Sequence, residues 1–285
     1  MMTKRTSCRL FLLTLVALLL LGACKGRIQP KMPLDSTAVN TEGVVREPHE
    51  GFELITIQDK PSRATRDLFA SYPAELIDSL LPAEGIATGI NCFLIANDHI
   101  TVLVDAGLGS EAGGVLLEKL AALQVRPEKI DAVLLTHFHP DHIGGLLHNG
   151  GPAFPTAHIY ASVPEFEAWT QGELAARNEQ VMAMLSNYAE RLHLFMDGDT
   201  LMDHIVAHLA PGHTPGHTLF ERGDVLIVGD MFHAAPLQTA CPELCARYDM
   251  DTAQAVQSRI KWTQYARQHQ LTIVGMHVAL PGVVQ

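Results

Sequence analysis

Residues 136–145 read THFHPDHIGG and place three histidines and one aspartate in a single short turn. The turn follows the apolar run 130–135, which is aliphatic, β-branched and short, so it predicts a buried strand. Neutral imidazole and carboxylate are the ligands that zinc prefers when a water must stay bound and reactive. We interpret the turn as a zinc site rather than a histidine-rich surface turn, because other segments carry further ligand-type residues in matching settings.

Four other apolar runs end in a residue that can bind a metal or orient a ligand. They are His213 after 205–209, Asp230 after 225–228, His277 after 271–275 and Asp105 after 102–104. In open α/β folds, ligand sites lie where strands end along one edge of a sheet. We therefore expect these four side chains to gather beside the histidine turn.

With these spaced motifs in this order, residues 52–282 resemble the metallo-β-lactamase superfamily. The resemblance implies an α/β fold, a four-layer αββα sandwich of two mixed sheets flanked by helices. It implies two metal ions, with an aspartate beside them that orients a ligand imidazole. The implied residues are His137, His139 and His213 on the first ion, Asp141, His142 and His277 on the second, Asp230 bridging both, and Asp105 as the orienting aspartate.

The residue types at two of these positions narrow the chemistry that the resemblance implies. A bridging Asp230 is similar to hydrolases of lactones, thioesters and phosphotriesters, whereas the zinc β-lactamases use Cys or leave the bridge out. His139 stands where the di-iron oxygen-reducing branch has Glu, so we expect two Zn²⁺, although iron or manganese also suits these ligands. A hydroxide bridging the ions would attack a carbonyl carbon or a phosphorus centre. We expect Asp141 to be catalytic as well as ligating, by positioning this hydroxide and taking its proton.

Several segments look like the methyl parathion hydrolase-like branch of this superfamily. They are residues 89–95, 139–145, 212–217, 229–235, 247–251 and 277–282. Members of that branch usually continue past the final Pro-Gly with another aromatic-rich strand, whereas this sequence stops at Gln285. Either that strand is missing or the sheet closes differently, and the sequence leaves both alternatives open.

Residues close to the ligands in the sequence are candidates for supporting the site or contacting substrate. His217 lies four residues after a ligand, and we expect it to brace the turn by donating to a carbonyl. The loops 60–88, 146–156 and 232–248 are expected to form the pocket walls, so the sequence does not fix the substrate. The expected pocket residues are His233, Phe232 and Phe154.

The N-terminus has the pattern of a bacterial lipoprotein signal. A basic start with Lys4, Arg5 and Arg9 precedes the apolar run 10–21, which is short of the ~20 residues that a transmembrane helix needs. Leu21-Gly22-Ala23-Cys24 resembles a lipobox, which implies cleavage before Cys24 and a lipid anchor on it. We expect a signal peptide over 1–23, a tether over 24–50 and the hydrolase domain over 51–285. The protein would be anchored in the bacterial cell envelope, facing the periplasm or the cell exterior.

The charge of the chain restricts its partners. It has 20 Lys and Arg and 31 Asp and Glu, and three of the basic residues lie in the expected signal, so the mature formal charge is −14. Such an acidic chain is a poor partner for nucleic acid. We expect a small-molecule substrate, membrane attachment through the lipid and, by analogy with related enzymes, a homodimer. Cys241 and Cys245 either form a disulfide or remain free thiols, and free thiols are the favoured interpretation.

The remaining pattern predicts alternating strands and helices. Strands are expected at 52–57, 90–95, 100–104, 130–135, 205–209, 225–228 and 271–275. Helices are expected at 115–123, 173–192 and 251–268, and Ser162 with Glu165 predicts a capping box at the start of a further short helix.

The expected function is therefore that of an envelope-tethered dinuclear zinc hydrolase acting on an ester, lactone or phosphotriester. One alternative is a periplasmic β-lactamase, which the bridging aspartate disfavours. A nuclease would use the same cluster, but the acidic charge argues against it. The alternative outside enzymes is a lipoprotein that binds a metal or ligand without turnover.

Overall fold

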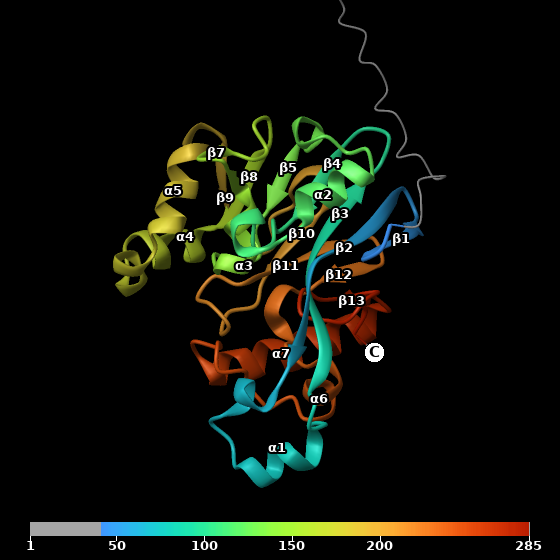
Figure 1. Ribbon diagram of the computed structural model, residues 1–285, viewed down its shortest axis with the longest axis vertical. Helices are drawn as coiled ribbons and strands as arrows, with labels where there is room; N and C mark the ends of the chain where they lie inside the picture. The colour runs from blue at the N-terminus through green and yellow to red at the C-terminus, as the bar shows by residue number, and fades with distance from the viewer. Residues whose placement is uncertain (1–40, 285) are drawn as a thin grey trace, which may run out of the picture. The chain divides into compact units, whose positions relative to one another are not determined.

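The computed structural model describes residues 41–284, and the expected signal peptide and Cys24 lie outside the described residues. Within them, two β-sheets pack face to face, with helices against the outer face of each sheet (Figure 1). The predicted four-layer α/β sandwich is confirmed.

The larger sheet has seven strands in the order β1-β2-β3-β4-β5-β8-β9. The first four strands pair antiparallel, while β4, β5, β8 and β9 run parallel. The strands are β1 (Val44–His49), β2 (Phe52–Ala64), β3 (Ile86–Ala96), β4 (Thr101–Val104), β5 (Ala132–Leu134), β8 (His158–Ser162) and β9 (Leu192–Phe195).

The second sheet has four strands in the order β10-β11-β12-β13, of which only β12 and β13 pair parallel. These strands are β10 (Val206–Leu209), β11 (Thr218–Arg222), β12 (Val225–Ile227) and β13 (Thr272–Val274). A two-stranded ribbon joins β6 (Leu147–His148) to β7 (Gly151–Pro152). Beyond β13, Val283 makes a single antiparallel bridge to Val274.

Seven α-helices and eight short 3₁₀ turns connect the strands of the described segment 41–284. The α-helices are α1 (Ala74–Leu80), α2 (Leu116–Ala122), α3 (Pro140–Ile143), α4 (Val163–Thr170), α5 (Glu179–Tyr188), α6 (Ala235–Ala240) and α7 (Thr252–His269). The 3₁₀ turns cover Arg66–Phe69, Ser110–Ala112, Pro127–Lys129, Gly144–Leu146, Glu173–Arg177, Ala189–Arg191, Met202–His204 and Gly229–Met231. None of the helices that are described is long and apolar enough to cross a membrane.

Alternating side chains on the strands create the layers. On β3, Leu94 points into the core beneath α2, α4 and α5, whereas its neighbours Phe93 and Ile95 point into the core between the two sheets. On β12, Leu226 faces the core under α7, which includes Trp262. A sheet that is buried on both faces requires this near-continuous apolar sequence, and β3 and β4 have it.

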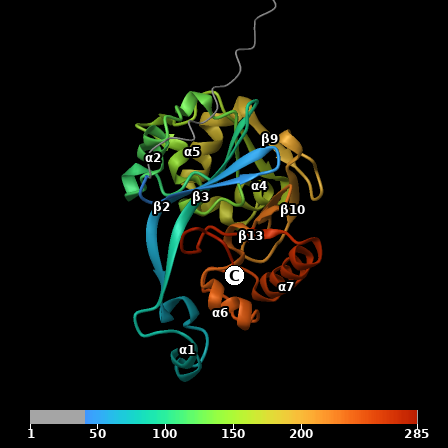
Figure 2. The same cartoon turned by 90° about the vertical axis from the view of Figure 1, so that its right-hand side faces the viewer.

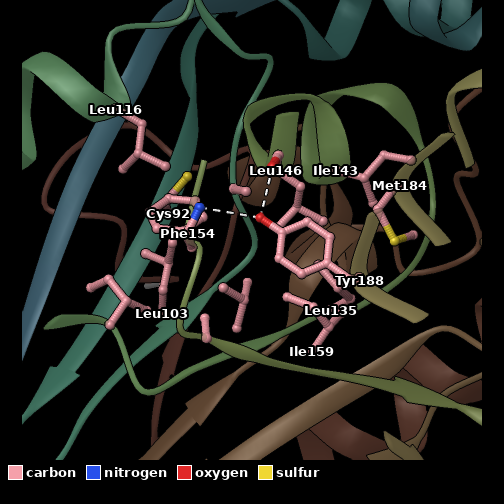
Figure 3. Packing of buried hydrophobic residues seen from close by; sticks show 14 of the residues in the cluster. Cys92, Leu103, Leu116, Leu135, Ile143, Leu146, Phe154, Ile159, Met184 and Tyr188 are labelled. Atoms are coloured by element: carbon pink, nitrogen blue, oxygen red, sulfur yellow. Dashed lines mark hydrogen bonds between the residues drawn. The ribbon is translucent and has the colours of Figure 1, made fainter. Parts of the chain in front are cut away.

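The core between α5 and the larger sheet also contains Tyr188, whose hydroxyl is satisfied by the backbone. The hydroxyl donates to the carbonyl of Leu146 at 2.8 Å and accepts from the Phe154 N–H at 3.2 Å (Figure 3). Phe154 is itself fully buried in this cluster. Its predicted place in the substrate pocket is therefore wrong.

Two element predictions need correction. The tether expected over 24–50 ends too late, because Val44–His49 is the edge strand β1, paired with β2. The single helix expected over 173–192 is a 3₁₀ turn, the helix α5 and a second turn, and its last residue begins strand β9. Strands β8 and β11 were not predicted.

Strands β2 and β3 extend beyond the sheet as a long ribbon that carries α1 (Figure 2). Phe69 and Ile77 of this arm pack with Leu237 and Leu244 from the α6 region. The arm is therefore held against the segment that follows Asp230, and the two together form walls of the cavity described below.

Candidate metal centre

Five strand ends deliver the predicted ligands and Asp105 to one place. Parallel strands β4 and β5 end just before Asp105 and the turn 136–142, and parallel strands β12 and β13 end just before Asp230 and His277. The loop between β10 and β11 supplies His213. All seven predicted ligands lie in two groups whose ligand atoms are within 4.8 Å of one another in each group.

The first group contains three imidazole nitrogens in close contact. Nε2 of His137 lies 3.0 Å from Nδ1 of His139, and Nε2 of His213 lies 3.2 and 3.0 Å from those two atoms. The Oδ2 atom of Asp230 is 3.2 Å from His213 Nε2. Neutral imidazole nitrogens facing one another repel unless protons or a cation lie between them. Three nitrogens and one carboxylate oxygen are the donor set of a four-coordinate zinc site.

The second group consists of Asp141, His142 and His277, two of which also approach the same aspartate. Asp230 Oδ1 lies 3.1 Å from His142 Nε2, and both atoms are buried without a hydrogen-bond partner. Nε2 of His277 lies 3.1 Å from Asp230 Oδ2 and 3.4 Å from Asp141 Oδ2. Two orphaned buried atoms facing each other are accounted for by a cation between them, because a buried polar atom without a partner is costly. The residues of both groups therefore fit divalent metal, and Asp230 lies against both groups.

Partners on the far side of the rings orient three ligand imidazoles. Nδ1 of His142 lies 2.7 Å from Asp105 Oδ2, Nδ1 of His213 lies 2.9 Å from Asp249 Oδ1, and Nδ1 of His277 lies 3.0 Å from the Gly89 carbonyl. Each acceptor places the proton on Nδ1 and leaves Nε2 free to bind a metal. Asp105 thus occupies the orienting position that was predicted for it.

The carboxylates and imidazoles of the two groups shift one another's pKa values. Burial opposes ionisation of Asp230, but His142, His277 and His213 around it hold its pKa well below the usual range. Burial likewise disfavours charged His277, yet Asp230 and Asp141 raise its pKa to about 10. His139 behaves in the opposite way, because burial and then His213 lower its pKa to about 3. Metal binding here must therefore displace protons from some ligands and not from others.

His217 supports the ligand loops as predicted. Its Nδ1 donates to the Ala210 carbonyl at 3.2 Å, and its Nε2 accepts from the Asp230 N–H at 3.0 Å. Burial lowers its pKa to about 3, so the ring stays neutral and can accept at Nε2. The chain passes close to this ring at Gly229, where φ is +49° and an added Cβ would lie 2.6 Å from His217 Nε2. Only glycine suits both the backbone angle and this approach.

Glu165 is a supporting residue whose role was missed in the sequence. It was predicted as part of a capping box, and Ser162 does cap α4 by accepting from the Glu165 N–H. The Glu165 carboxylate, however, accepts from groups on two different ligand loops and on α4. These donors are Phe138 N at 2.9 Å, Trp169 Nε1 at 2.7 Å, Thr214 Oγ1 at 2.7 Å and Gly216 N at 2.9 Å. It therefore ties the loop of His137 and His139 to the loop of His213.

Asp249 and Arg259 form a second supporting pair that the sequence did not reveal. Asp249 orients His213 with one oxygen, and its other oxygen lies 3.5 Å from Nη2 of the buried Arg259. Arg259 also donates from Nε to the Met231 carbonyl at 2.9 Å. Helix α7 is thereby connected through a buried ion pair to one metal ligand.

A cavity of about 410 Å³ opens over the two groups. Its lining includes Asp141, His233 and the exposed aromatic Tyr248. Phe232 does not line this cavity, because its extended backbone sends it to the opposite side from His233, into the core under α7. The predicted pocket role of Phe232 is therefore wrong, as it is for Phe154. The walls are Ser62, Arg63, Leu68, Thr88, Ile90, Leu108 and Pro140.

Cys241 and Cys245 do not form a disulfide, and Cys92 is a buried free thiol in β3. The favoured interpretation, that Cys241 and Cys245 are free thiols, is confirmed.

The sequence model of the metallo-beta-lactamase superfamily matches residues 85–261. Among solved structures, hydrolase AbOPH of the beta-lactamase superfamily is 27% identical, with a TM-score of 0.76 over 86% of this chain and 93% of that one. AidC, a dizinc quorum-quenching lactonase, has the same fold at 24% identity, with a TM-score of 0.76 over 85% of this chain and 92% of that one.

Curated relatives match over a shorter segment. YobT of Bacillus subtilis (strain 168), an uncharacterized protein, is 27% identical over 50% of this chain and 62% of its own length. The hydroxyacylglutathione hydrolase of Aeromonas salmonicida (strain A449) is 33% identical over 48% of this chain and 44% of its own length. The chain thus spans about half the length of the curated relatives it matches. The family model covers well over half of the chain, and the protein belongs to the metallo-beta-lactamase superfamily.

Proposed function

We propose that this protein is a metal-dependent hydrolase that holds two Zn²⁺ ions and cleaves an ester, lactone or phosphotriester. The position of Asp230 carries the proposal. One of its oxygens lies in the histidine group of His137, His139 and His213, and the other faces the orphaned nitrogen of His142. A single buried carboxylate between two complete donor sets is the arrangement that a two-ion centre needs.

Bound at these residues, two divalent ions would lower the pKa of a water towards ~7 and polarise the group that it attacks. The chain supplies the remaining functions. Asp141 lies at the cavity wall with Oδ2 near His277, and we assign it the task of orienting the attacking water and accepting its proton. The wall residues Leu68, Ile90 and Leu108 are apolar and would favour an apolar substituent on the substrate.

The relatives support a hydrolase function but do not identify the substrate. Among the neighbours are a quorum-quenching lactonase and hydroxyacylglutathione hydrolases. We place the chain in the methyl parathion hydrolase-like branch because several of its segments resemble that branch. These segments extend from GINCFLI at 89–95 to HVALPG at 277–282. A lipid on Cys24 and a site facing the periplasm or the cell exterior complete the proposal. We also propose, by analogy with related enzymes, that the protein forms a homodimer.

A panel of substrates with the zinc-loaded protein tests this function. The panel contains an aryl ester, an acyl-homoserine lactone, a thioester, a phosphotriester and a cephalosporin. We expect turnover of at least one of the first four, its loss on chelation and its loss in Asp230→Asn. The matched control Asp224→Asn changes an exposed aspartate that pairs with His49 and should leave turnover unchanged. Turnover of the cephalosporin alone, or turnover that survives chelation, would overturn the proposal.

A further inference from the structure

The loop that carries His277 is bonded to strand β3 of the larger sheet. Strand β3 extends past the end of β4, and at residues 89–91 the edge of β3 opposite β2 contacts this loop instead. The Asn91 N–H donates to the Met276 carbonyl at 3.0 Å, and the Gly89 carbonyl accepts from Nδ1 of His277 at 3.0 Å. A ligand that follows a strand of the second sheet is thereby held against the larger sheet.

The completely buried side chain of Asn91 adds two bonds between β3 and this loop. Its amide nitrogen Nδ2 donates to the Gly275 carbonyl at 3.1 Å and to the Val278 carbonyl at 2.7 Å. These carbonyls lie on either side of His277 in the sequence, so one carboxamide holds the chain both before and after the ligand. An NH₂ group has the two donors that this requires, whereas a hydroxyl has one and an apolar side chain has none.

The oxygen of the Asn91 carboxamide indicates that the donors are what this position requires. Oδ1 is buried and has no hydrogen-bond partner among the described residues. An unpaired buried acceptor costs stability, so an apolar residue would suit a purely packing role better. The neighbouring Gly89 makes room for this oxygen, because a Cβ there would lie 2.9 Å from Oδ1.

We propose that Asn91 is a positioning residue that keeps His277 in place for a metal ion in the second group. This inference rests on the proposed two-ion function. Asn91 belongs to neither ligand group and does not line the cavity, so it acts only through the loop 275–278. The loop places Nε2 of His277 3.4 Å from Asp141 Oδ2. Partners that orient a ligand ring raise metal affinity although they do not touch the metal.

Stepwise zinc affinities, measured by competition with a chelator, separate this role from a general effect on folding. Asn91→Leu has a side chain of similar size without donors, and Asn91→Ser is a milder variant that keeps one donor. His277→Ala identifies the binding step that depends on the second group. The matched control is Leu94→Ala on the same strand, which leaves a cavity in the core beneath the helices and should destabilise the fold without touching the loop.

We expect Asn91→Leu to lower the affinity of the step that His277→Ala identifies by about 10- to 100-fold and to leave the other step unchanged. Asn91→Ser should show a smaller loss at the same step. Leu94→Ala should unfold at a lower denaturant concentration than wild type and keep both zinc affinities. Equal losses at both steps, losses that Leu94→Ala reproduces, or wild-type affinities in both Asn91 variants would overturn the inference.

A second measurement uses the metal-free protein and needs no zinc. The proton on Nδ1 of His277 is observed by NMR and assigned by its absence in His277→Ala. Because this proton is bonded to the Gly89 carbonyl, we expect its signal in Asn91→Leu to move to higher field and to exchange faster with water. An unchanged signal would overturn the inference. A wild type that binds fewer than two zinc ions would refute the two-ion function, and the NMR signal would still decide whether Asn91 positions His277.

Discussion

Asp105 Oδ2 and His142 Nδ1 are 2.7 Å apart, and both residues are completely buried. The aspartate is fixed in turn by Thr136, whose N–H donates to Oδ1 at 2.8 Å and whose hydroxyl donates to Oδ2 at 2.6 Å. Asp105 has φ of +57°, at the sharp bend where β4 ends. A carboxylate that is satisfied on all sides holds His142 with Nε2 toward Asp230.

Asp105→Asn is expected to weaken zinc binding at the group that contains His142. Asparagine tolerates a left-handed backbone, but its amide NH₂ must face either Thr136 or the His142 N–H, so one hydrogen bond is lost. Loss of such an orienting partner typically costs about 10- to 100-fold in metal affinity. Titration with a zinc-binding indicator measures this. Asp98→Asn in an exposed turn is the control, and equal affinities for wild type and Asp105→Asn would refute the role.

Asp141→Asn tests the proposed proton acceptor. We expect kcat to fall by about 10²- to 10⁴-fold, because an amide can neither accept the proton nor orient the water as a carboxylate does. His142 and His277 lower the pKa of Asp141 against the effect of burial, so the wild-type group is ionised at neutral pH. Zinc content and kcat are measured on the same samples. Full turnover at intact zinc content would show that Asp141 has no catalytic role.

Glu165→Gln should destabilise the protein and loosen both ligand loops. A neutral amide cannot accept the four hydrogen bonds that the Glu165 carboxylate accepts, and its NH₂ would face a donor. Each buried donor left unpaired costs about 1–3 kcal/mol, so we expect a loss of a few kcal/mol in unfolding free energy. Denaturant unfolding of the metal-free protein measures it. Glu167→Gln, an exposed neighbour on α4, should differ from wild type by less than about 0.5 kcal/mol.

Zinc binding should release protons and strengthen as pH rises. Burial opposes the charged form of His277, but Asp230 and Asp141 raise its pKa to about 10 in the metal-free protein, so it is protonated at pH 8. Zinc must displace that proton, and its apparent affinity should climb with pH up to about pH 10. Calorimetry in buffers of different ionisation enthalpy gives the proton count. A count of zero at pH 8 would contradict the coupling.

The raised pKa of His277 also makes the stability of the metal-free protein depend on pH. The folded pKa of His277 lies above its ordinary value of 6.5, so the stabilisation is full below pH 6.5 and is lost as pH rises through about 10. The metal-free protein should therefore unfold at lower denaturant concentration at pH 10 than at pH 7, and the zinc-loaded protein should show a smaller difference.

The candidate ligands lie together, as the sequence predicted, because short apolar strands precede the segments that contain them. His137, Asp230 and His277 are all placed by that rule, and parallel pairing then brings the strand ends together. Phe154 and Phe232 were wrongly assigned to the pocket because nearness in sequence does not give side-chain direction. Residue 232 is extended, so it points away from its neighbour 233.

The supporting residues could not be found in the same way. Glu165 lies in a capping-box pattern, which explains its presence without revealing that its carboxylate joins two distant loops. Asp249 and Arg259 meet only through the packing of α7. The strands β1 and β9 were not predicted because of their local sequences. Strand β1 has the polar sequence of an edge strand, and β9 directly follows a helical pattern.

The most direct test of the two-ion centre is a count of zinc per chain taken together with activity. Zinc is removed completely by chelation and then added back in steps, and bound zinc and the rate of hydrolysis are measured on each sample. We predict that activity saturates only at two zinc ions per chain and that Asp230→Asn never reaches that content. Full activity at one zinc per chain, or activity in the metal-free protein, would contradict a two-ion centre.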